Sequence, residues 1–199
     1  MKDIMQNRFS CRKFKNEKIE NAKIKEILDF ARLTPSSCGL EPWKFVVISK
    51  SDELDELGKI CNNQNQVKTC SHAVVILARN DLKSSCEFLQ NQVKRKQTIT
   101  EKYNKAMEYF ANRFDHQTND ELTHYASLQC YLLCANLINI AYDMDIKSCV
   151  IGGFDKISLT NFINLTNNFT PVLVVALGLS DETAPAKMRL SLDDILIWR

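Results

Sequence analysis

Residues 33–48 read LTPSSCGLEPWKFVVI and join two regions with different apolar patterns. Upstream, Ile24, Ile27 and Ala31 recur at the spacing of one helix face, whereas the apolar residues after Trp43 are consecutive and largely β-branched. Between them lie two prolines, a glycine and a serine pair, which end a helix and favour a turn-rich loop. The sequence therefore predicts a helix over 21–33, a loop, and a buried strand over 45–48.

The loop itself carries groups suited to a ligand. Ser36 and Ser37 offer hydroxyl and backbone donors, and the flanking Pro35 and Pro42 limit the freedom of the chain. Taken alone, an ordinary connection between a helix and a strand explains these residues more simply. The loop is therefore a candidate binding segment that needs support from other parts of the chain.

Further apolar runs predict the rest of a small sheet. Residues 72–78 and 171–178 are typical of buried strands, and residues 147–151 predict a strand that leads into a glycine pair. We expect helices over 52–60, within 84–116 and over 122–142, the last with apolar coverage broad enough for the central helix. This alternation predicts an α/β or α+β fold, and we expect one domain over 1–199.

Two details of these helices can be checked against the structure. The central helix owes its predicted broad apolar coverage to residues that include Leu128, Tyr131 and Leu132. The polar region before it predicts exposed helices, with Tyr109 and Phe110 facing solvent.

Composition excludes several classes of partner. The chain of 199 residues has 26 Lys and Arg against 24 Asp and Glu, a net charge of +2. This balance gives no global field for a nucleic acid or an anionic membrane, so we expect neither partner. The N-terminus has no signal-peptide core, and no apolar run approaches the roughly 20 residues of a membrane helix. We therefore expect a cytoplasmic protein whose eight cysteines are reduced.

The cysteines show no spacing typical of a metal site. Cys130 and Cys134 lie four residues apart on a predicted apolar helix face, and Cys70 and His72 flank the start of a predicted strand. For both pairs, packing as buried side chains is a better explanation than a metal or redox pair. The sequence therefore predicts no metal ligands.

Three other segments place cations or glycines in distinctive positions. Residues 8–14 read RFSCRKF, which alone is typical of a solvated basic segment. Gly152 and Gly153 follow a predicted strand and precede Asp155, so they suit either a close backbone approach to a ligand or a plain turn before a capped helix. Near the C-terminus, Lys187 and Arg189 place two cations two residues apart.

Together these segments resemble the FMN-dependent nitroreductase family over essentially the whole chain. The family's Arg-x-Ser-x-Arg/Lys start is present as Arg8, Ser10 and Arg12, and its Pro-Ser-Ser-x-Asn-x-Gln-Pro-Trp loop is present, with changes, as residues 35–43. The resemblance implies an α+β fold with a small, mainly antiparallel central sheet flanked by helices, in an intertwined homodimer. It also implies FMN as cofactor and NADPH or NADH as electron donor. The eight cysteines and the sequence Ile-Gly-Gly-Phe-Asp look most like the oxygen-insensitive NADPH nitroreductases.

The same resemblance assigns residues to the flavin. Arg8, Lys187 and Arg189 would clamp the phosphate, because guanidinium groups grip a phosphate at two points and stay charged. Arg12 would lie near the pyrimidine end of the ring and favour its reduced form. The Gly152-Gly153 turn would direct a backbone amide at the hydride-accepting nitrogen.

In such a dimer, the loop at 35–37 and the glycine turn would come from the subunit opposite the one that clamps the phosphate. Cys38 and Phe110 would line the acceptor pocket. The residues that the resemblance assigns to FMN are Arg8, Phe9, Ser10, Arg12, Pro35, Ser36, Ser37, Gly39, Asn63, Gln129, Ile151, Gly152, Gly153, Lys187 and Arg189.

Three positions depart from the family pattern. Gly39 stands in place of an asparagine and Glu41 in place of a glutamine, so two amides that face the flavin are missing or changed. Gln66 stands where some members have a lysine, although Lys68 is near. Fewer cations predict a weaker oxidant and weaker cofactor binding.

The first hypothesis for function is a ping-pong oxidoreductase that passes two electrons from a nicotinamide, through FMN, to a nitroaromatic, nitroimidazole or quinone acceptor. A flavin-binding protein with low turnover, or a flavin reductase or oxidase in the same fold, is the alternative. A flavin-independent, cysteine-rich redox or metal protein is a third possibility.

Overall fold

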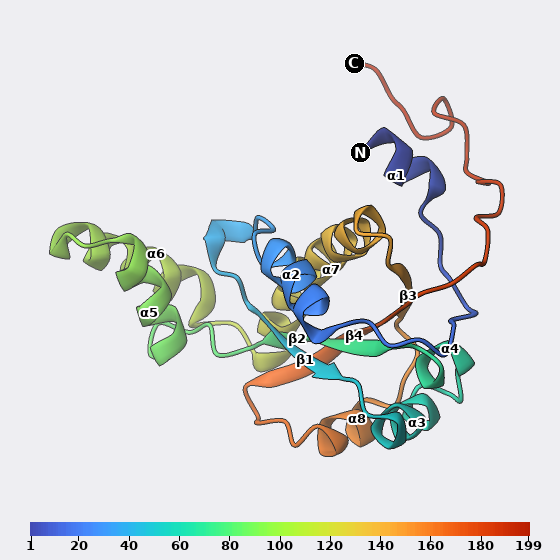
Figure 1. The fold of residues 1–199 in the computed structure, drawn as a ribbon. Helices are drawn as coiled ribbons and strands as arrows, with labels where there is room; N and C mark the ends of the chain where they lie inside the picture. Colours follow the sequence, from blue (N-terminus) through green and yellow to red (C-terminus); the bar gives the residue numbers. More distant parts are fainter.

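The computed structural model describes residues 1–199 and contains one four-stranded sheet with helices on both faces (Figure 1). The strands are β1 (Trp43–Ile48), β2 (His72–Arg79), β3 (Lys147–Ile151) and β4 (Phe169–Gly178). Their order across the sheet is β1-β2-β4-β3, and every neighbouring pair is antiparallel. The predicted α+β fold with a small antiparallel sheet is thus confirmed.

The helices divide between the two faces of the sheet. Helices α2, α5, α6 and α7 contribute to the larger apolar cluster on one face, and α3, α4 and α8 to the smaller cluster on the other. Alternate side chains of β2 reach the two clusters, as the two-residue period of a strand requires. The bounds are α1 (Lys2–Asn7), α2 (Asn21–Ala31), the 3₁₀ turn η1 (Ser37–Gly39), α3 (Ser51–Ile60), α4 (Asn65–Lys68), α5 (Glu87–Lys96), α6 (Thr100–Phe114), α7 (Asn119–Asp143) and α8 (Lys156–Phe162).

Strand β1 lies at an edge of the sheet. It pairs only with β2, so Phe45 and Val46 are half-buried and Val47 is 43% exposed, whereas Ile48 is buried. The strand is where the sequence predicts it, but the prediction of full burial is wrong for residues 45–47. A run of β-branched residues predicts extended backbone without saying how many neighbours the strand has.

Helix α7 is the longest helix and lies against α1, α2 and all four strands. It begins with a capping box, in which Thr118 accepts from Glu121 N and the Glu121 carboxylate accepts from Thr118 N at 2.8 Å. One side of α7 is buried, but Leu128, Tyr131 and Leu132 are 55%, 56% and 46% exposed. The prediction of a central helix is confirmed, but part of the apolar coverage on which it rested lies on a side of α7 that one chain leaves exposed.

The cysteine pairs considered for metal binding are packed in the core instead. Cys130 and Cys134 are buried on α7, and Cys70 and His72 are buried at the start of β2, which confirms the packing prediction. All eight cysteines are free thiols in this structure. No helix has the length and apolar character that crossing a membrane requires.

Candidate active site

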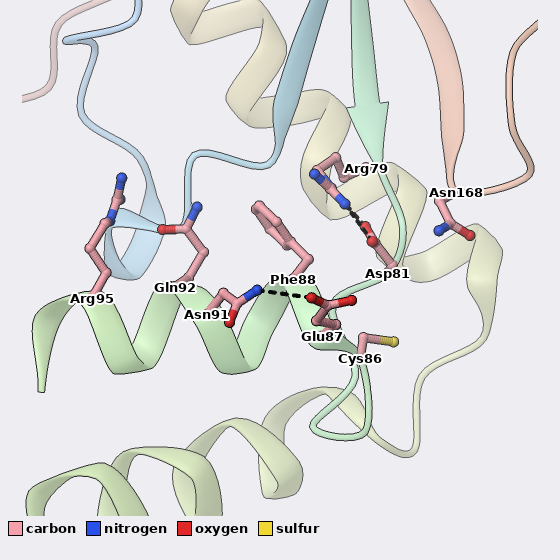
Figure 2. Close-up of a pocket in the computed structure, with 9 residues that line it drawn as sticks. All are labelled: Arg79, Asp81, Cys86, Glu87, Phe88, Asn91, Gln92, Arg95 and Asn168. Atoms are coloured by element: carbon pink, nitrogen blue, oxygen red, sulfur yellow. Dashed lines mark hydrogen bonds and ion pairs between the residues drawn. The ribbon is translucent and has the colours of Figure 1, made fainter.

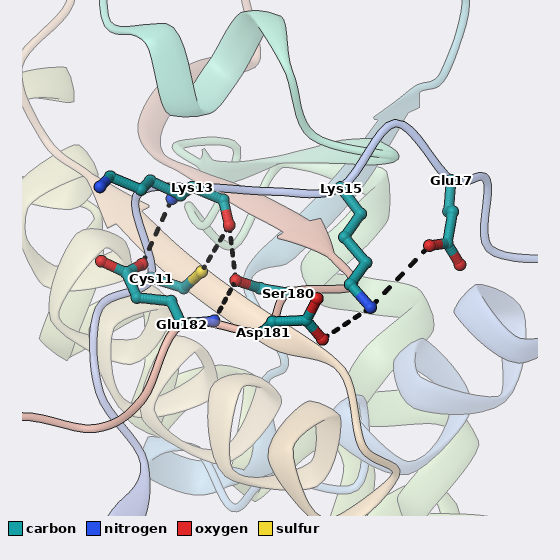
Figure 3. A network of polar contacts seen from close by, with 7 residues as sticks. All are labelled: Cys11, Lys13, Lys15, Glu17, Ser180, Asp181 and Glu182. Atoms are coloured by element: carbon teal, nitrogen blue, oxygen red, sulfur yellow. Dashed lines mark hydrogen bonds and ion pairs between the residues drawn. The ribbon is translucent and has the colours of Figure 1, made fainter.

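The N-terminal segment is fixed beside β3 and the chain that follows β4. Ser10 forms a parallel bridge with Ser148, and Cys11 N donates to Ser148 O at 2.9 Å. The carboxylate of Glu182 accepts from the backbone N of Lys13 at 3.3 Å (Figure 3). It also accepts from the backbone N of Arg12 at 2.9 Å, and this bond is the main cause of a lowered Glu182 pKa. Two segments about 170 positions apart are thereby held together.

This arrangement brings together the three cations predicted to clamp a phosphate. Lys187 Nζ donates to Arg8 O, and Arg8 Nε is buried without a hydrogen-bond partner. Partial loss of water around its ammonium, followed by repulsion from Arg8 and Arg189, lowers the pKa of Lys187. No carboxylate forms a salt bridge with any of the three. A cation cluster with an unsatisfied buried donor fits a phosphate dianion.

Other predicted flavin residues lie along the same side of the chain. The Arg12 guanidinium is exposed and donates to Ser10 O at 3.3 Å, while Phe9 is half-buried. The positive charge of Arg12 favours a lower pKa of the Cys149 thiol on β3, but burial of the thiol is the larger effect and raises this pKa overall. Ile151, at the end of β3, is buried and is opposite Val174 of β4.

The glycine turn after β3 lies beside the loop that carries Asn63. Gln64 Nε2 donates to Gly153 O at 3.3 Å, and Lys68 Nζ donates to Asn63 Oδ1 at 3.2 Å. A Cβ on Gly152 would meet only Leu173, at 3.9 Å, so the turn leaves open space for another molecule. The turn, the Asn63 loop and the N-terminal segment all lie near β3 of one chain, and the expectation that the turn comes from the subunit opposite the clamp stays a prediction.

The Pro-Ser-Ser loop is fixed to helix α7 of its own chain. Gln129 Oε1 accepts from Ser37 N at 2.9 Å, and Ser36 Oγ accepts from Glu41 N at 2.9 Å. Pro35 is exposed at the start of the loop. Gln129 therefore orients the loop, a role that its position on a predicted helix did not indicate.

Next to this loop is a largely apolar cavity of about 330 Å³. It brings together Cys38 and Phe110, the two residues predicted to line an acceptor pocket, although they are far apart in the sequence. Tyr109 is 50% exposed as expected, but Phe110 is 7% exposed and stacks on Phe114, so the prediction that Phe110 faces solvent is wrong. Three polar residues of this cavity, Gln92, Lys96 and Gln97, could not be identified from the sequence, because on and just after α5 they look like ordinary polar positions.

A larger cavity of about 600 Å³ contains none of the predicted site residues (Figure 2). In its wall Arg79 forms a two-point pair with Asp81 at 2.8 and 2.5 Å, and the guanidinium carbon lies 3.7 Å from the centroid of the Phe88 ring. These charges are already satisfied within the chain, which indicates a structural role. The structure contains no group of three or more His, Cys, Asp or Glu side chains that could hold a metal ion.

The predicted site residues form two groups within one chain. The first group consists of the N-terminal cations, the Asn63 loop, the glycine turn and the cations of the C-terminal tail; the second consists of the Pro-Ser-Ser loop, Gln129 and the 330 Å³ cavity. In Figure 1 the loop before β1 lies on one side of α2 and α7, and the N-terminal segment and the tail lie on the other. One chain therefore does not bring the two groups into one cleft.

Comparisons with known proteins agree with this fold. The family described as "Nitroreductase family" matches residues 5–179. A Staphylococcus saprophyticus protein, provisionally described by its name as an NAD(P)H nitroreductase, is 34% identical over 194 residues, which cover 92% of this chain and 89% of that protein. A Staphylococcus haemolyticus relative with the same provisional description is 32% identical and covers 100% and 98% of the two chains.

Solved structures extend the similarity to three dimensions. A nitroreductase-like protein from Streptococcus mutans has a TM-score of 0.89 at 22% identity, over 99% of this chain and 97% of that one. A protein from Exiguobacterium sibiricum, solved in complex with FMN, has a TM-score of 0.83 at 21% identity, over 96% and 93% of the chains. With the family match over residues 5–179, these similarities show that the chain belongs to the nitroreductase family.

Proposed function

We propose that this protein is an FMN-dependent NAD(P)H oxidoreductase that reduces nitroaromatic, nitroimidazole or quinone acceptors and works as a homodimer. The observation that carries the proposal is the cluster of Arg8, Lys187 and Arg189, which has no carboxylate partner and contains a buried, unsatisfied Nε. Such a cluster is unfavourable by itself and becomes favourable when a phosphate binds.

The other residues of the first group would complete the cofactor site. Bound FMN would take two electrons as hydride from NADPH or NADH and deliver them to the acceptor. Arg8, Lys187, Arg189 and the Ser10 hydroxyl would hold the phosphate, and the exposed Arg12 guanidinium would place positive charge at the pyrimidine end of the ring. The open space at Gly152 would allow the backbone to approach the ring closely.

A second copy of the chain would complete the site, because the two groups of residues are separated within one chain. The exposed side chains of Leu128, Tyr131 and Leu132 on α7 form an apolar surface that a partner would cover. The tail after β4 is also exposed and carries Ile197 and Trp198, which are 82% and 86% exposed. In a dimer, the cavity with Cys38 and Phe110 would be the acceptor pocket beside the flavin of the other half.

Two measurements test this function. The purified protein should show the absorption bands of bound FMN, and NADPH or NADH should bleach them in anaerobic stopped-flow experiments, with colour restored by a nitroaromatic or a quinone. Failure of both nicotinamides to reduce the flavin within minutes would contradict the proposed enzymatic function.

Replacing Leu132 with Glu should yield monomers in analytical ultracentrifugation and loss of bound FMN, since dimerisation and FMN binding would both need the apolar surface.

The salt bridge between Glu41 and Arg95 at 2.6 Å favours a second candidate, a flavin-binding protein with low turnover. Glu41 stands where the family pattern has a glutamine whose amide would face the ring. In this chain its carboxylate pairs with Arg95 of α5 instead. This candidate predicts a yellow protein that is not reduced by nicotinamides, so the stopped-flow experiment separates the two functions.

A further inference from the structure

The last turn of helix α5 holds the loop that precedes β1. Lys96 Nζ donates to Gly39 O and, at 3.3 Å, to Cys38 O. The neighbouring Arg95 pairs with Glu41 at 2.6 Å. Two consecutive cations of one helix therefore contact three residues of the loop.

The loop needs such contacts because of its backbone conformation. Cys38, Gly39 and Glu41 have φ angles of 55°, 61° and 52°, all in the left-handed region. A residue with a Cβ occupies this region at a cost of roughly 1 kcal/mol or more, so Cys38 and Glu41 are strained unless their surroundings favour it. The hydrogen bonds from Lys96 and the pair with Arg95 supply this compensation.

The ammonium of Lys96 also fills the space that a side chain at position 39 would use. A Cβ on Gly39 would lie 2.6 Å from Lys96 Nζ and 3.6 Å from its Cε, so a larger residue would displace the ammonium from its present position. Lys96 also lines the 330 Å³ cavity together with Cys38 and Phe110. Two of its three N–H donors go to loop carbonyls, which leaves one for a ligand.

We propose that Lys96 replaces the side chain missing at position 39, holding the loop and presenting its remaining N–H donor and positive charge to the flavin ring. The proposal rests on the function proposed above, in which the loop borders FMN. Position 39 is where the sequence departs from the asparagine of the family pattern. The structure thus offers an ammonium from α5 where that pattern has an amide, and a charged donor forms the stronger hydrogen bond.

The first test measures the Kd of FMN for the apoprotein by quenching of flavin fluorescence. Lys96→Met keeps most of the aliphatic stem but loses the charge, and it should weaken FMN binding about tenfold or more, the scale of one charge-assisted hydrogen bond. Lys96→Arg should retain most of the affinity. Lys94→Met is the matched control, because it removes the same charge from an exposed position of the same helix and should leave the Kd unchanged.

The second test exchanges the two side chains. Replacing Lys96 with Ala makes room at position 39, and Asn tolerates the left-handed conformation that Gly39 adopts. Gly39→Asn combined with Lys96→Ala should recover most of the affinity that Lys96→Ala alone loses. Gly39→Ala combined with Lys96→Ala should not, because a methyl group fills space without donating a hydrogen bond.

The outcomes separate this inference from the function on which it rests. If the wild-type protein does not bind FMN, the proposed function falls and this inference falls with it. If the wild type binds FMN and Lys96→Met binds it equally well, only this inference is overturned. Equal recovery by the Asn and Ala double variants would also overturn it, since the site would then need volume rather than a donor.

Discussion

Arg79 and Arg8 show two opposite ways in which this chain uses an arginine. Arg79 is 22% exposed, binds Asp81 at two points and lies over the Phe88 ring (Figure 2). Arg8 has a buried Nε without a partner, and its charged neighbours are Lys187 and Arg189. The first arginine finds its counter-charge within the chain, whereas the second needs an anion from outside. An arginine that is paired within the chain therefore has a structural role here, and an arginine without a counter-charge indicates an anion-binding site.

A large effect on stability should come from breaking the satisfied pair. Arg79→Ala leaves the Asp81 carboxylate, only 13% exposed, without its partner, so the free energy of unfolding should fall by about 2 to 3 kcal/mol. Urea unfolding at a fixed protein concentration measures this loss, and the Kd of FMN should not change. Unchanged stability, or weakened FMN binding in a folded variant, would contradict the structural assignment of Arg79.

The opposite result is expected at the unsatisfied cluster. Arg8→Ala should weaken FMN binding by about 2 to 3 kcal/mol, because charge-assisted bonds to the phosphate are lost, while the stability of the apoprotein stays within about 0.5 kcal/mol. Titration of FMN and urea unfolding of the apoprotein give the two numbers. If Arg8→Ala and Arg189→Ala both keep the wild-type Kd, the clamp is assigned to the wrong residues.

Inorganic phosphate should sharpen the contrast without any flavin. Phosphate at ten times its Kd should stabilise the wild-type apoprotein by about 1.4 kcal/mol, the linkage expected for one site. The shift should persist in Arg79→Ala and disappear in the double variant Arg8→Ala with Arg189→Ala. Thermal unfolding against chloride at matched ionic strength provides the measurement. An equal shift in the double variant would show that phosphate acts elsewhere.

The smallest effect concerns a satisfied neutral group, His72. Its Nε2 lies 2.8 Å from Asn21 Oδ1 and its Nδ1 lies 3.0 Å from Ser71 Oγ, and burial, followed by repulsion from Lys18, lowers the pKa of His72. Below the ordinary histidine pKa of about 6.5, the unfolded chain binds a proton that the folded protein resists. Stability should therefore fall as the pH drops through that value, by at most about 1.4 kcal/mol per pH unit.

Urea unfolding between pH 7.5 and pH 5.5 tests this effect. His72→Gln removes the ionisable ring, so its stability should change less over this range than that of the wild type, even if it is lower throughout. Parallel pH profiles for the two proteins would exclude His72 as the source of the dependence.

Much of the fold could be predicted from the sequence. The apolar periods located the four strands, the central helix and the helix capped by Asp155, since these features depend on residues near one another in the chain. The exposure of Leu128, Tyr131 and Leu132 and the edge position of β1 could not be predicted, because they depend on which elements pack together. The burial of Phe110 has the same cause.

For the candidate site, the sequence alone determined which cations, glycines and hydroxyls are present and in what order, which is enough to resemble the family. Only the tertiary structure decided that Arg8 meets Lys187 and Arg189 without a carboxylate, and that the Lys96 ammonium lies against Gly39. The physical reason is that the energy of a charge depends on the neighbours that folding brings within a few ångströms. Those neighbours come from segments that are far apart in the sequence.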